Sequence, residues 1–382
     1  MRKFNALTIA MSALSLAMCL CIGCAPVQST ANIAPKATVV ADGKVPVFTH
    51  SYSEYPSWSV FGVAESMDLL NGKRGQQGTL EKKWNVDIVL VAADYDTCLT
   101  QFSSNTVDSS CLTTLDSLAP SIGRPTVVIL PTSTSDGADA CIVANSVLTA
   151  GRDDFILNEM KNIPVYGLEK SVSQYAFERV LTTRGQNPKD YKFRNMDPAA
   201  AAQAMQTNQP NVNAIMVWNP FVLQTLRTRK DTKAIFSSDV LKEEIIDAVV
   251  VGKDVVAREG GDRYAACLID SYYQVCNAIN DPATSDKTTV SLGEKFCSLN
   301  LADMRLCLEQ TKFYDSPVKA KNLLSNPRFQ NEIMPQVVDF CVSHEIVPNN
   351  GSGKRFGFEN PDALLNFTTK YIDLAVAGPS SK

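Results

Sequence analysis

The sequence predicts an α/β protein built from two lobes, and three observations support that prediction. Short apolar runs alternate with amphipathic stretches from Val45 onward, which is typical of a mostly parallel sheet flanked by helices. This alternation occurs twice along the chain, and after Val255 the sequence becomes largely helical. At 382 residues the chain is long enough for two such units and a helical C-terminal region.

The first series of elements begins at Val45. Runs such as "VDIVLVAA" and "TVVILP" are short, apolar and β-branched, which indicates buried strands. The expected strands are 45–50, 86–93, 107–112 and 126–131, and the expected helices are 57–70, 95–104 and a helix that starts at 113.

The second series follows the same logic. Strands are expected at 163–167, 190–196, 212–218, 234–238 and 245–252, with helices at 171–183, at 197–206 and after 219. Residues 45–140 are therefore assigned to the first part of lobe 1, 141–248 to lobe 2, and 249–382 to the completion of lobe 1 and the C-terminal helices.

The first 24 residues are predicted to be a lipoprotein signal peptide. Their apolar stretch, Ala6 to Ile22, is shorter than a membrane span requires. It ends in "LCIGC", which resembles a bacterial lipobox and makes Cys24 the expected lipidation site, although Cys21 stands where such boxes usually carry Leu. An ordinary cleaved signal peptide is the alternative. Residues 25–44 are small and polar, as in a flexible tether.

Composition argues against several classes of function. The net charge is -4, and neither a basic run nor an RNA-binding aromatic motif is present, so no nucleic-acid partner is expected. Eight cysteines follow the leader, and an exported protein permits disulfides, with Cys98–Cys111 and Cys297–Cys307 the first pairs to test. The chain has two histidines and no C-x-x-C pair, so we expect no metal site, no cofactor and no Cys–His nucleophile.

Candidate functional residues lie where strands end and helices begin, since ligands of open α/β sheets bind at those junctions. After the first strand, Tyr55 and Trp58 offer flat apolar walls and Ser57 a small hydroxyl, or alternatively the junction is a helix cap with one aromatic residue in the core. After the third strand, Thr113 and Asp116 have the spacing of a helix cap, which alone would explain both. A ligand-facing Thr114 hydroxyl is the sharper alternative.

Two further junctions belong to the second lobe. In "GLEKSVSQY", Ser171 and Gln174 have the spacing of a capping box, and Glu169 precedes a helix start that would otherwise suit an anion. In "WNPF", Asn219 is expected to cap a helix that begins at a proline, and Trp218 faces either the crevice or the core. The hydroxyl-rich segment 129–143 is either a surface loop or the first crossing between lobes.

No junction carries a motif for phosphate or covalent chemistry. The chain has no G-x-x-x-x-G-K-[ST], no G-x-G-x-x-G and no G-x-S-x-G. The residues at the junctions are hydroxyls, aromatics and a few acids, which favours holding a small polar molecule over breaking bonds.

The sequence resembles the substrate-binding proteins of ABC importers in the nitrate/taurine/sulfonate group. The segments "SVSQYAFERVLTTRGQ" (171–186) and "AIMVWNPF" (214–221) are similar to that group's helix start and strand end. Within the group, "DYDTCLTQFSSNTVDSSCLTTLDSL", "GLEKSVSQYAFERVL", "VWNP", "IFSSDVLKEEIIDAVVV" and "FYDSPVKAKNLLS" look most like the urea carboxylase-associated branch. Gln174, where many relatives carry His, and "YPSW" depart from the pattern.

The resemblance implies a periplasmic-binding-protein type II fold, in which a hinge joins two lobes around a ligand. It also implies a set of ligand contacts from both lobes: Ser57, Trp58, Thr113, Thr114, Asp116, Glu169, Ser171, Ser173, Tyr175, Trp218 and Asn219, with Asp239 near the return to the hinge.

The charges at these junctions narrow the expected ligand. Glu169, Asp116 and Asp239 are acidic and no arginine stands among the candidates, so a buried anion would be repelled. Carboxylates accept N–H bonds, and urea, an amide or a guanidine-like solute therefore fits better than taurine, an alkanesulfonate or nitrate. The alternative is that Glu169 and Asp116 only complement helix dipoles.

We therefore expect an exported, lipid-anchored, monomeric binding protein of the periplasm or cell surface, not an enzyme, that delivers its solute to an ABC permease and its ATPase. Two rival hypotheses stay open. One is an exported enzyme on the same fold that acts on a pyrimidine or amide, for which His50 and Cys111 are the reactive residues to watch. The other is a structural lipoprotein without a ligand.

Overall fold

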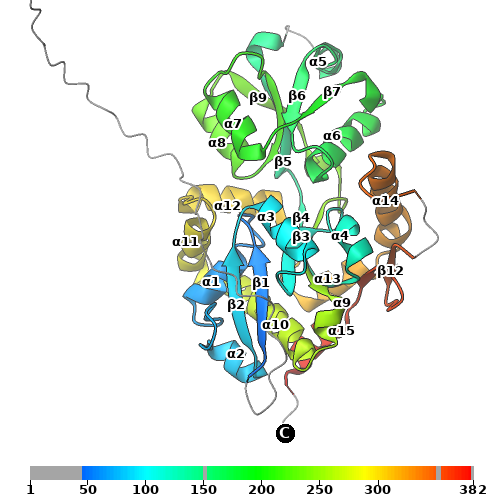
Figure 1. Cartoon of the computed structure of the whole chain (residues 1–382). Helices are drawn as coiled ribbons and strands as arrows, with labels where there is room; N and C mark the ends of the chain where they lie inside the picture. Colours follow the sequence, from blue (N-terminus) through cyan, green and yellow to red (C-terminus); the bar gives the residue numbers. More distant parts are fainter. Residues whose placement is uncertain (1–44, 149–152, 350–353, 380–382) are drawn as a thin grey trace, which may run out of the picture.

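The computed structural model describes residues 45–148, 153–349 and 354–379 and has two lobes, each built on its own β-sheet (Figure 1). Lobe 1 holds an eight-stranded sheet and lobe 2 a five-stranded sheet. The α/β fold with two lobes and a helical C-terminal region is confirmed. The predicted signal peptide, its Cys24 and the tether lie outside the described residues.

The sheet of lobe 1 has the order β12-β13-β4-β10-β3-β1-β2, and β11 also pairs with β4. β1 runs parallel to β2 and β3, whereas β10 is antiparallel to both β3 and β4. The strands are β1 (Val47–Tyr52), β2 (Asp87–Ala92), β3 (Ser109–Thr113), β4 (Thr126–Ser135), β10 (Ile246–Gly252), β11 (Thr311–Phe313), β12 (Phe356–Phe358) and β13 (Leu365–Phe367).

The helices of lobe 1 come from both ends of the described chain. α10 is the longest described helix of this lobe and contributes ten buried residues to the lobe's hydrophobic core. The helices are α1 (Val60–Ser66), α2 (Thr79–Trp84), α3 (Tyr95–Ser103), α4 (Leu118–Gly123), α9 (Lys253–Val256), α10 (Gly261–Asn280), α11 (Ser285–Lys295), α12 (Leu301–Gln310), α13 (Pro317–Leu324), α14 (Met334–Ser343) and α15 (Lys370–Ala377), with a π-helical turn at Phe329–Ile333.

Lobe 2 has the strand order β7-β6-β8-β5-β9 and helices on both faces of the sheet. Alternate side chains of a strand point to opposite faces, so Cys141 and Val143 join one apolar cluster while Ala140 and Ile142 join the other. The elements are β5 (Asp139–Ala144), β6 (Pro164–Gly167), β7 (Lys192–Asn195), β8 (Ala214–Trp218), β9 (Thr232–Ser237), α5 (Asp153–Met160), α6 (Val172–Thr183), α7 (Pro198–Gln206) and α8 (Phe221–Thr228), with 3₁₀ turns at Asn145–Val147, Pro188–Asp190 and Ser238–Val240.

The chain crosses between the lobes twice. It leaves the first sheet after β4 and enters the second at β5, so residues 136–138 form the first crossing. It returns between β9 and β10, through residues 238–245. The expected lobe boundaries at 140 and 248 therefore fall inside β5 and β10, a few residues beyond each crossing.

The main local differences from the sequence-based expectation concern polar segments. The hydroxyl-rich stretch 129–143 is not a surface loop: its β4 and β5 portions are fully buried, and the first crossing lies between them. Neither of the two cysteine pairs named as the first to test forms a disulfide, since Cys98, Cys111 and Cys307 are buried free thiols. Within the described part of the chain, no helix is both long and apolar enough to span a membrane.

Candidate functional site

Four aromatic side chains lie at the boundary between the two lobes and connect them. Trp58 stacks on Tyr95 with ring centroids 5.4 Å apart and an angle of 9° between the planes, and Tyr55 lies 4.9 Å from Trp58. Tyr95 then meets the edge of Trp218, at 6.2 Å and 73°, across the boundary between lobes. We call Tyr55, Trp58, Tyr95 and Trp218 the aromatic cluster. It brings together the predicted Trp58 and Trp218 and the Tyr55 named at the first junction, and it adds Tyr95, which the candidate set lacked.

The aromatic cluster carries polar atoms that have no partner. Trp58 is 4% exposed, yet its indole Nε1 forms no hydrogen bond, and neither does the hydroxyl of Tyr55. Because more than nine in ten buried polar groups in proteins are satisfied, two neighbouring unsatisfied donors indicate a position for water or ligand. Trp218 and Tyr95 are only half-buried, so part of each ring remains accessible.

Asp116 is tied to the same cluster through Tyr95. The Tyr95 hydroxyl donates to Asp116 Oδ2 at 2.7 Å, and Thr113 Oγ1 donates to the same oxygen at 2.8 Å. Thr113 Oγ1 also accepts from the Asp116 backbone N–H, as the cap spacing predicted. This bond closes a turn and does not start a helix, because α4 begins only at Leu118, so the expected helix start at 113 is wrong. Burial raises the pKa of Asp116 to about 6, although both hydroxyl donors oppose the shift. Thr114 is buried beside this cap.

Ser57 belongs to a buried hydroxyl chain that ends on an acid outside the predicted set. Its Oγ lies 3.0 Å from Thr132 Oγ1 and 2.8 Å from Ser133 Oγ. Ser133 donates to Oδ2 of Asp247 at 2.6 Å. Asp247 is the second residue of β10 and pairs in register with Thr113 on one side and Ser133 on the other. A single acid inside the apolar run "IIDAVVVG" was the sequence signal for it.

A second acid lies at the first crossing. Asp139 opens β5, is 2% exposed, and pairs in register with Trp218 of the aromatic cluster. Its Oδ2 accepts from Ser135 at 2.6 Å, and Ser135 lies 2.7 Å from Ser238. Burial raises the pKa of Asp139 to about 6. Asp139 was also missed in the sequence, where it lies in a segment rich in turn-forming residues.

The start of α6 supplies the second lobe's share of the predicted residues. Ser171 caps the helix and accepts from the Ser173 backbone N–H at 3.1 Å, while Gln174 accepts from the backbone N–H of Lys170 and not from that of Ser171. The buried Ser173 Oγ has no partner. The side chain of Glu169 is half-buried, and its backbone N–H donates to Asn195.

Three predicted residues lie differently from what their motifs suggested. Tyr175 donates to Glu244 at 3.0 Å and packs edge-on against Phe340 of α14, so its hydroxyl is already used. Asn219 does not cap α8; its Nδ2 donates to Gln310 of α12 while its Oδ1 has no partner. Asp239 is exposed and accepts from Ser237.

Polar contacts also hold the lobes together away from the aromatic cluster. Figure 1 shows α12 below α8 and α14 beside α6. Arg227 of α8 forms an ion pair with Asp303 of α12, and His344 lies 2.9 Å from Glu178 of α6. Helices α12 and α14 of lobe 1 therefore contact helices α8 and α6 of lobe 2.

His50 and Cys111 are adjacent, with Nε2 and Sγ 3.5 Å apart. Both are fully buried, so burial lowers the pKa of His50 to about 3 and raises the pKa of Cys111 well above its ordinary value. A neutral imidazole beside a protonated, inaccessible thiol is not an activated nucleophile. This geometry argues against the enzyme hypothesis.

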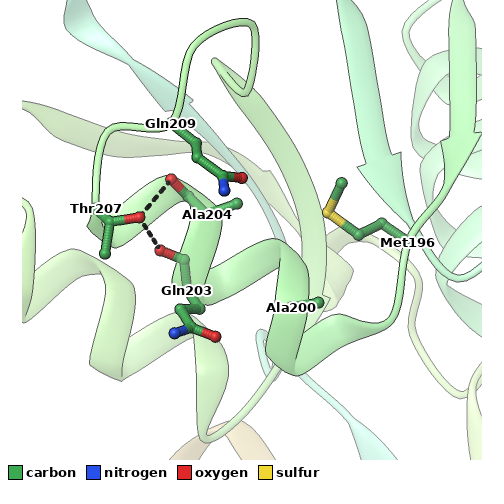
Figure 2. A pocket seen from close by; sticks show the side chains of 6 residues that line it. All are labelled: Met196, Ala200, Gln203, Ala204, Thr207 and Gln209. Carbon is green, nitrogen blue, oxygen red and sulfur yellow. Dashed lines mark hydrogen bonds between the residues drawn. The ribbon is translucent and has the colours of Figure 1, made fainter.

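A surface pocket of about 300 Å³ lies elsewhere, at α7 (Figure 2). It is lined by Met196, Ala200, Gln203, Ala204, Thr207 and Gln209, and the Thr207 hydroxyl is already bonded to carbonyls of its own helix. None of the predicted site residues lines it. Among the described residues, no three His, Cys, Asp or Glu side chains are grouped as a metal ion requires.

Comparison with solved structures identifies the fold. The alkanesulfonate-binding protein SsuA from Xanthomonas axonopodis pv. citri bound to MOPS matches with a TM-score of 0.60 at 14% identity, over 80% of this chain and 96% of that one. The periplasmic aliphatic sulphonate binding protein SsuA from Escherichia coli matches with a TM-score of 0.60 at 16% identity, over 79% and 89%.

The periplasmic nitrate-binding protein NrtA from Synechocystis PCC 6803 matches with a TM-score of 0.56 at 12% identity, over 78% of this chain and 85% of that one. No protein-family model matches the sequence, and no curated protein matches it significantly. At identities this low the likeness extends to the fold alone. The chain has the fold of the periplasmic binding proteins.

Proposed function

We propose that this protein is the substrate-binding component of an ABC importer and captures a small polar solute between its lobes. The observation that carries the proposal is the aromatic cluster, which joins strand ends of both lobes and holds unsatisfied polar atoms at their boundary. Two chain crossings give the lobes a hinge, so a ligand that contacts both would favour a closed state. The sulfonate- and nitrate-binding proteins of the same fold support this class of function.

The solute that fits best is nitrogen-rich: urea, an amide or a guanidine-like molecule. Asp116, Asp139 and Asp247 are buried near the lobe boundary. Asp96 lies close to Asp94 and, from the other lobe, to Asp197: burial raises the pKa of Asp96 and both neighbours raise it further. A carboxylate-rich surface accepts N–H bonds and repels anions.

A sulfonate or nitrate remains the second candidate, and one feature favours it. The N-terminus of α6 presents the unpartnered Ser173 hydroxyl, and a helix N-terminus attracts anions. The nearby arginine does not help such an anion, because Arg179 is held in a two-pronged contact with Glu244 at 2.8 and 2.9 Å.

The proposed function also includes export of the protein and its attachment to a membrane. Export by the leader and lipidation of Cys24 would tether a monomer to the membrane that holds its permease and ATPase. The solute is bound and released without a covalent step, so no cofactor is required.

A thermal-shift screen tests the function. Urea, guanidinium, acetamide, taurine, nitrate and uracil are each added at millimolar concentration to the purified protein. A ligand at 100 times its dissociation constant stabilises a protein by about 2.7 kcal/mol, which is a clear shift in Tm. A nitrogen-rich solute is expected to give the largest shift, with Trp58→Leu abolishing it. If no solute in the panel changes Tm, the binding function is wrong.

A further inference from the structure

Two buried carboxylates lie on the strands that follow the two crossings between the lobes, one in each lobe. Asp139 opens β5 immediately after the first crossing, and Asp247 is the second residue of β10, which follows the second crossing. Their register partners, Trp218 and Thr113, are both residues of the candidate site. Each acid is 2% exposed. The hinge therefore brings one acid from each sheet to the boundary where the aromatic cluster lies.

Neither acid has a positive partner. Asp139 accepts from the Ser135 hydroxyl and Asp247 from the Ser133 hydroxyl, and the Tyr55 hydroxyl also lowers the pKa of Asp247. Neither acid forms an ion pair with a described residue. Burial raises the pKa of Asp247 well above its ordinary value, and the charge of Asp139 raises it further. Two carboxylates without a positive partner in such a place are costly when ionised, so burial favours their protonated forms.

Unpartnered hydroxyls accompany the two acids. The Tyr55 ring is 4% exposed, and its hydroxyl has no hydrogen bond of good geometry to a described residue. Burial raises the pKa of Tyr55, and so do the charges of Asp247 and Asp139, while the hydroxyls of Thr311 and Ser135 lower it, which places all four residues close to it. Thr311 is 1% exposed, faces Ser135 in the register of β11 with β4, and also has an unpartnered Oγ1. Buried polar atoms without partners, next to two acids without a positive partner, indicate a binding position for a polar group of the solute.

We propose that Asp139 and Asp247 together recognise the positively charged nitrogen group of the solute, a protonated amine or amidine, with the Tyr55 hydroxyl beside it. This inference rests on the proposed function and narrows its ligand from nitrogen-rich to cationic. An organic cation with several N–H donors suits the site better than a metal ion, because no three ligating side chains among the described residues converge. The flat rings of the aromatic cluster are also surfaces on which a planar cation stacks.

The position of the acids couples recognition to closure. A cation that contacts Asp139 on β5 and Asp247 on β10 bridges the two sheets, so its binding energy favours the closed arrangement. Binding requires ionised carboxylates, so it releases protons, and affinity rises with pH while the acids titrate. The ionisable groups that face Asp247 are Asp139, Asp116 and Tyr55, none of which supplies a positive charge.

Matched pairs of solutes test the inference by isothermal titration calorimetry on the full mature chain. Guanidinium and urea have the same shape but differ in charge, as do acetamidinium and acetamide. We expect each cation to bind about 100-fold or more tightly than its neutral counterpart at pH 8. The affinity for the cation should fall at pH 5, and the binding heat should depend on the ionisation enthalpy of the buffer.

Asp139→Asn and Asp247→Asn should each lower the affinity for the cation at least tenfold and leave the affinity for the neutral solute unchanged. Asp286→Asn, an exposed acid of α11, is the control that should change neither. Tyr55→Phe provides a milder variant if an asparagine variant fails to fold. Equal binding of cation and neutral solute, a flat pH profile, or binding that depends on Na⁺ or K⁺ overturns the inference. If urea binds and both cations do not, the proposed function survives; if nothing binds, both fail.

Discussion

Tyr95 performs two roles at the scale of single residues. Its ring stacks on Trp58 and touches Trp218, and its hydroxyl donates to the buried Asp116. The same hydroxyl accepts from the Thr113 backbone N–H at 3.2 Å. Because the ring joins two lobes and the hydroxyl supports an acid, the effect of removing the hydroxyl should depend on the ionisation of Asp116.

Tyr95→Phe is predicted to destabilise the protein more at pH 8 than at pH 5. With a pKa near 6, Asp116 is ionised at pH 8 and loses one of two donors, which costs about 1–3 kcal/mol. At pH 5 the protonated acid needs that donor less. Thermal unfolding measures the difference, and it is preferred because urea and guanidinium are candidate ligands. Tyr371→Phe, on α15, is the control, and an equal loss at both pH values would contradict the prediction.

At the scale of elements, the C-terminal helices of lobe 1 connect the two lobes. α12 contacts lobe 2 through Asp303 with Arg227 and through Gln310 with Asn219 at 2.7 Å. α14 contacts α6 through Phe340 with Tyr175 and through His344 with Glu178. These pairs are available only while the lobes are close, so they stabilise the closed arrangement together with any ligand.

Arg227→Gln is predicted to loosen the contact between α8 and α12. Asp303 is buried while the Arg227 side chain is half exposed, so loss of Arg227 leaves a buried carboxylate without its cationic partner. Hydrogen–deuterium exchange should become faster in both helices while the core strands stay protected. Arg305→Gln, which removes a pair between α12 and α11 inside lobe 1, is the control. Unchanged exchange in α8 would show that the pair does not hold the lobes.

Helices and strands were predicted well where apolar residues recur with a single regular spacing along the sequence. They were predicted poorly where polar residues are buried. The strand at 163–167 and the helix at 171–183 appear as β6 and α6, because an apolar run and a capped amphipathic stretch are local signals. β5 and the end of β4 were not separable from a loop, because their hydroxyls are satisfied by distant partners such as Ser238 and Asp247. Asp139 and Asp247 were not among the predicted site residues for the same reason, since their surroundings depend on contacts between distant parts of the chain.

At the scale of the whole molecule, the buried ionisable groups are mostly acids. Burial raises the pKa of Asp116 and Asp139 to about 6, and it raises that of Asp247 further. Glu81 and Asp87 of lobe 1 shift in the same direction, again chiefly through burial. Each of these carboxyl groups stays protonated to a higher pH in the folded protein than in the unfolded chain. This difference determines whether stability rises or falls with pH.

Stability of the ligand-free protein is therefore predicted to fall as pH rises from about 4 to 6. Between the unfolded and folded pKa values of Asp116 and Asp139 the native state binds more protons, so each added pH unit costs about 1.4 kcal/mol for each of these two acids. His50 has the opposite effect on stability below pH 6.5, because burial lowers its pKa to about 3. It is a single group, and several acids contribute to the loss of stability. Differential scanning calorimetry from pH 4 to 8 should show a Tm that decreases between pH 4 and 6.

Two variants decide whether the acids cause that decrease. Asp139→Asn removes one raised carboxyl and should flatten the decrease, whereas the exposed Asp286→Asn should leave it unchanged. A cationic ligand that pairs with the ionised acids should restore Tm most strongly at the alkaline end, where the empty site is least stable. A Tm that rises with pH in the wild type would mean that hydroxyl donors such as Ser133 and Ser135 already stabilise the ionised carboxylates, and the site would then need no cation.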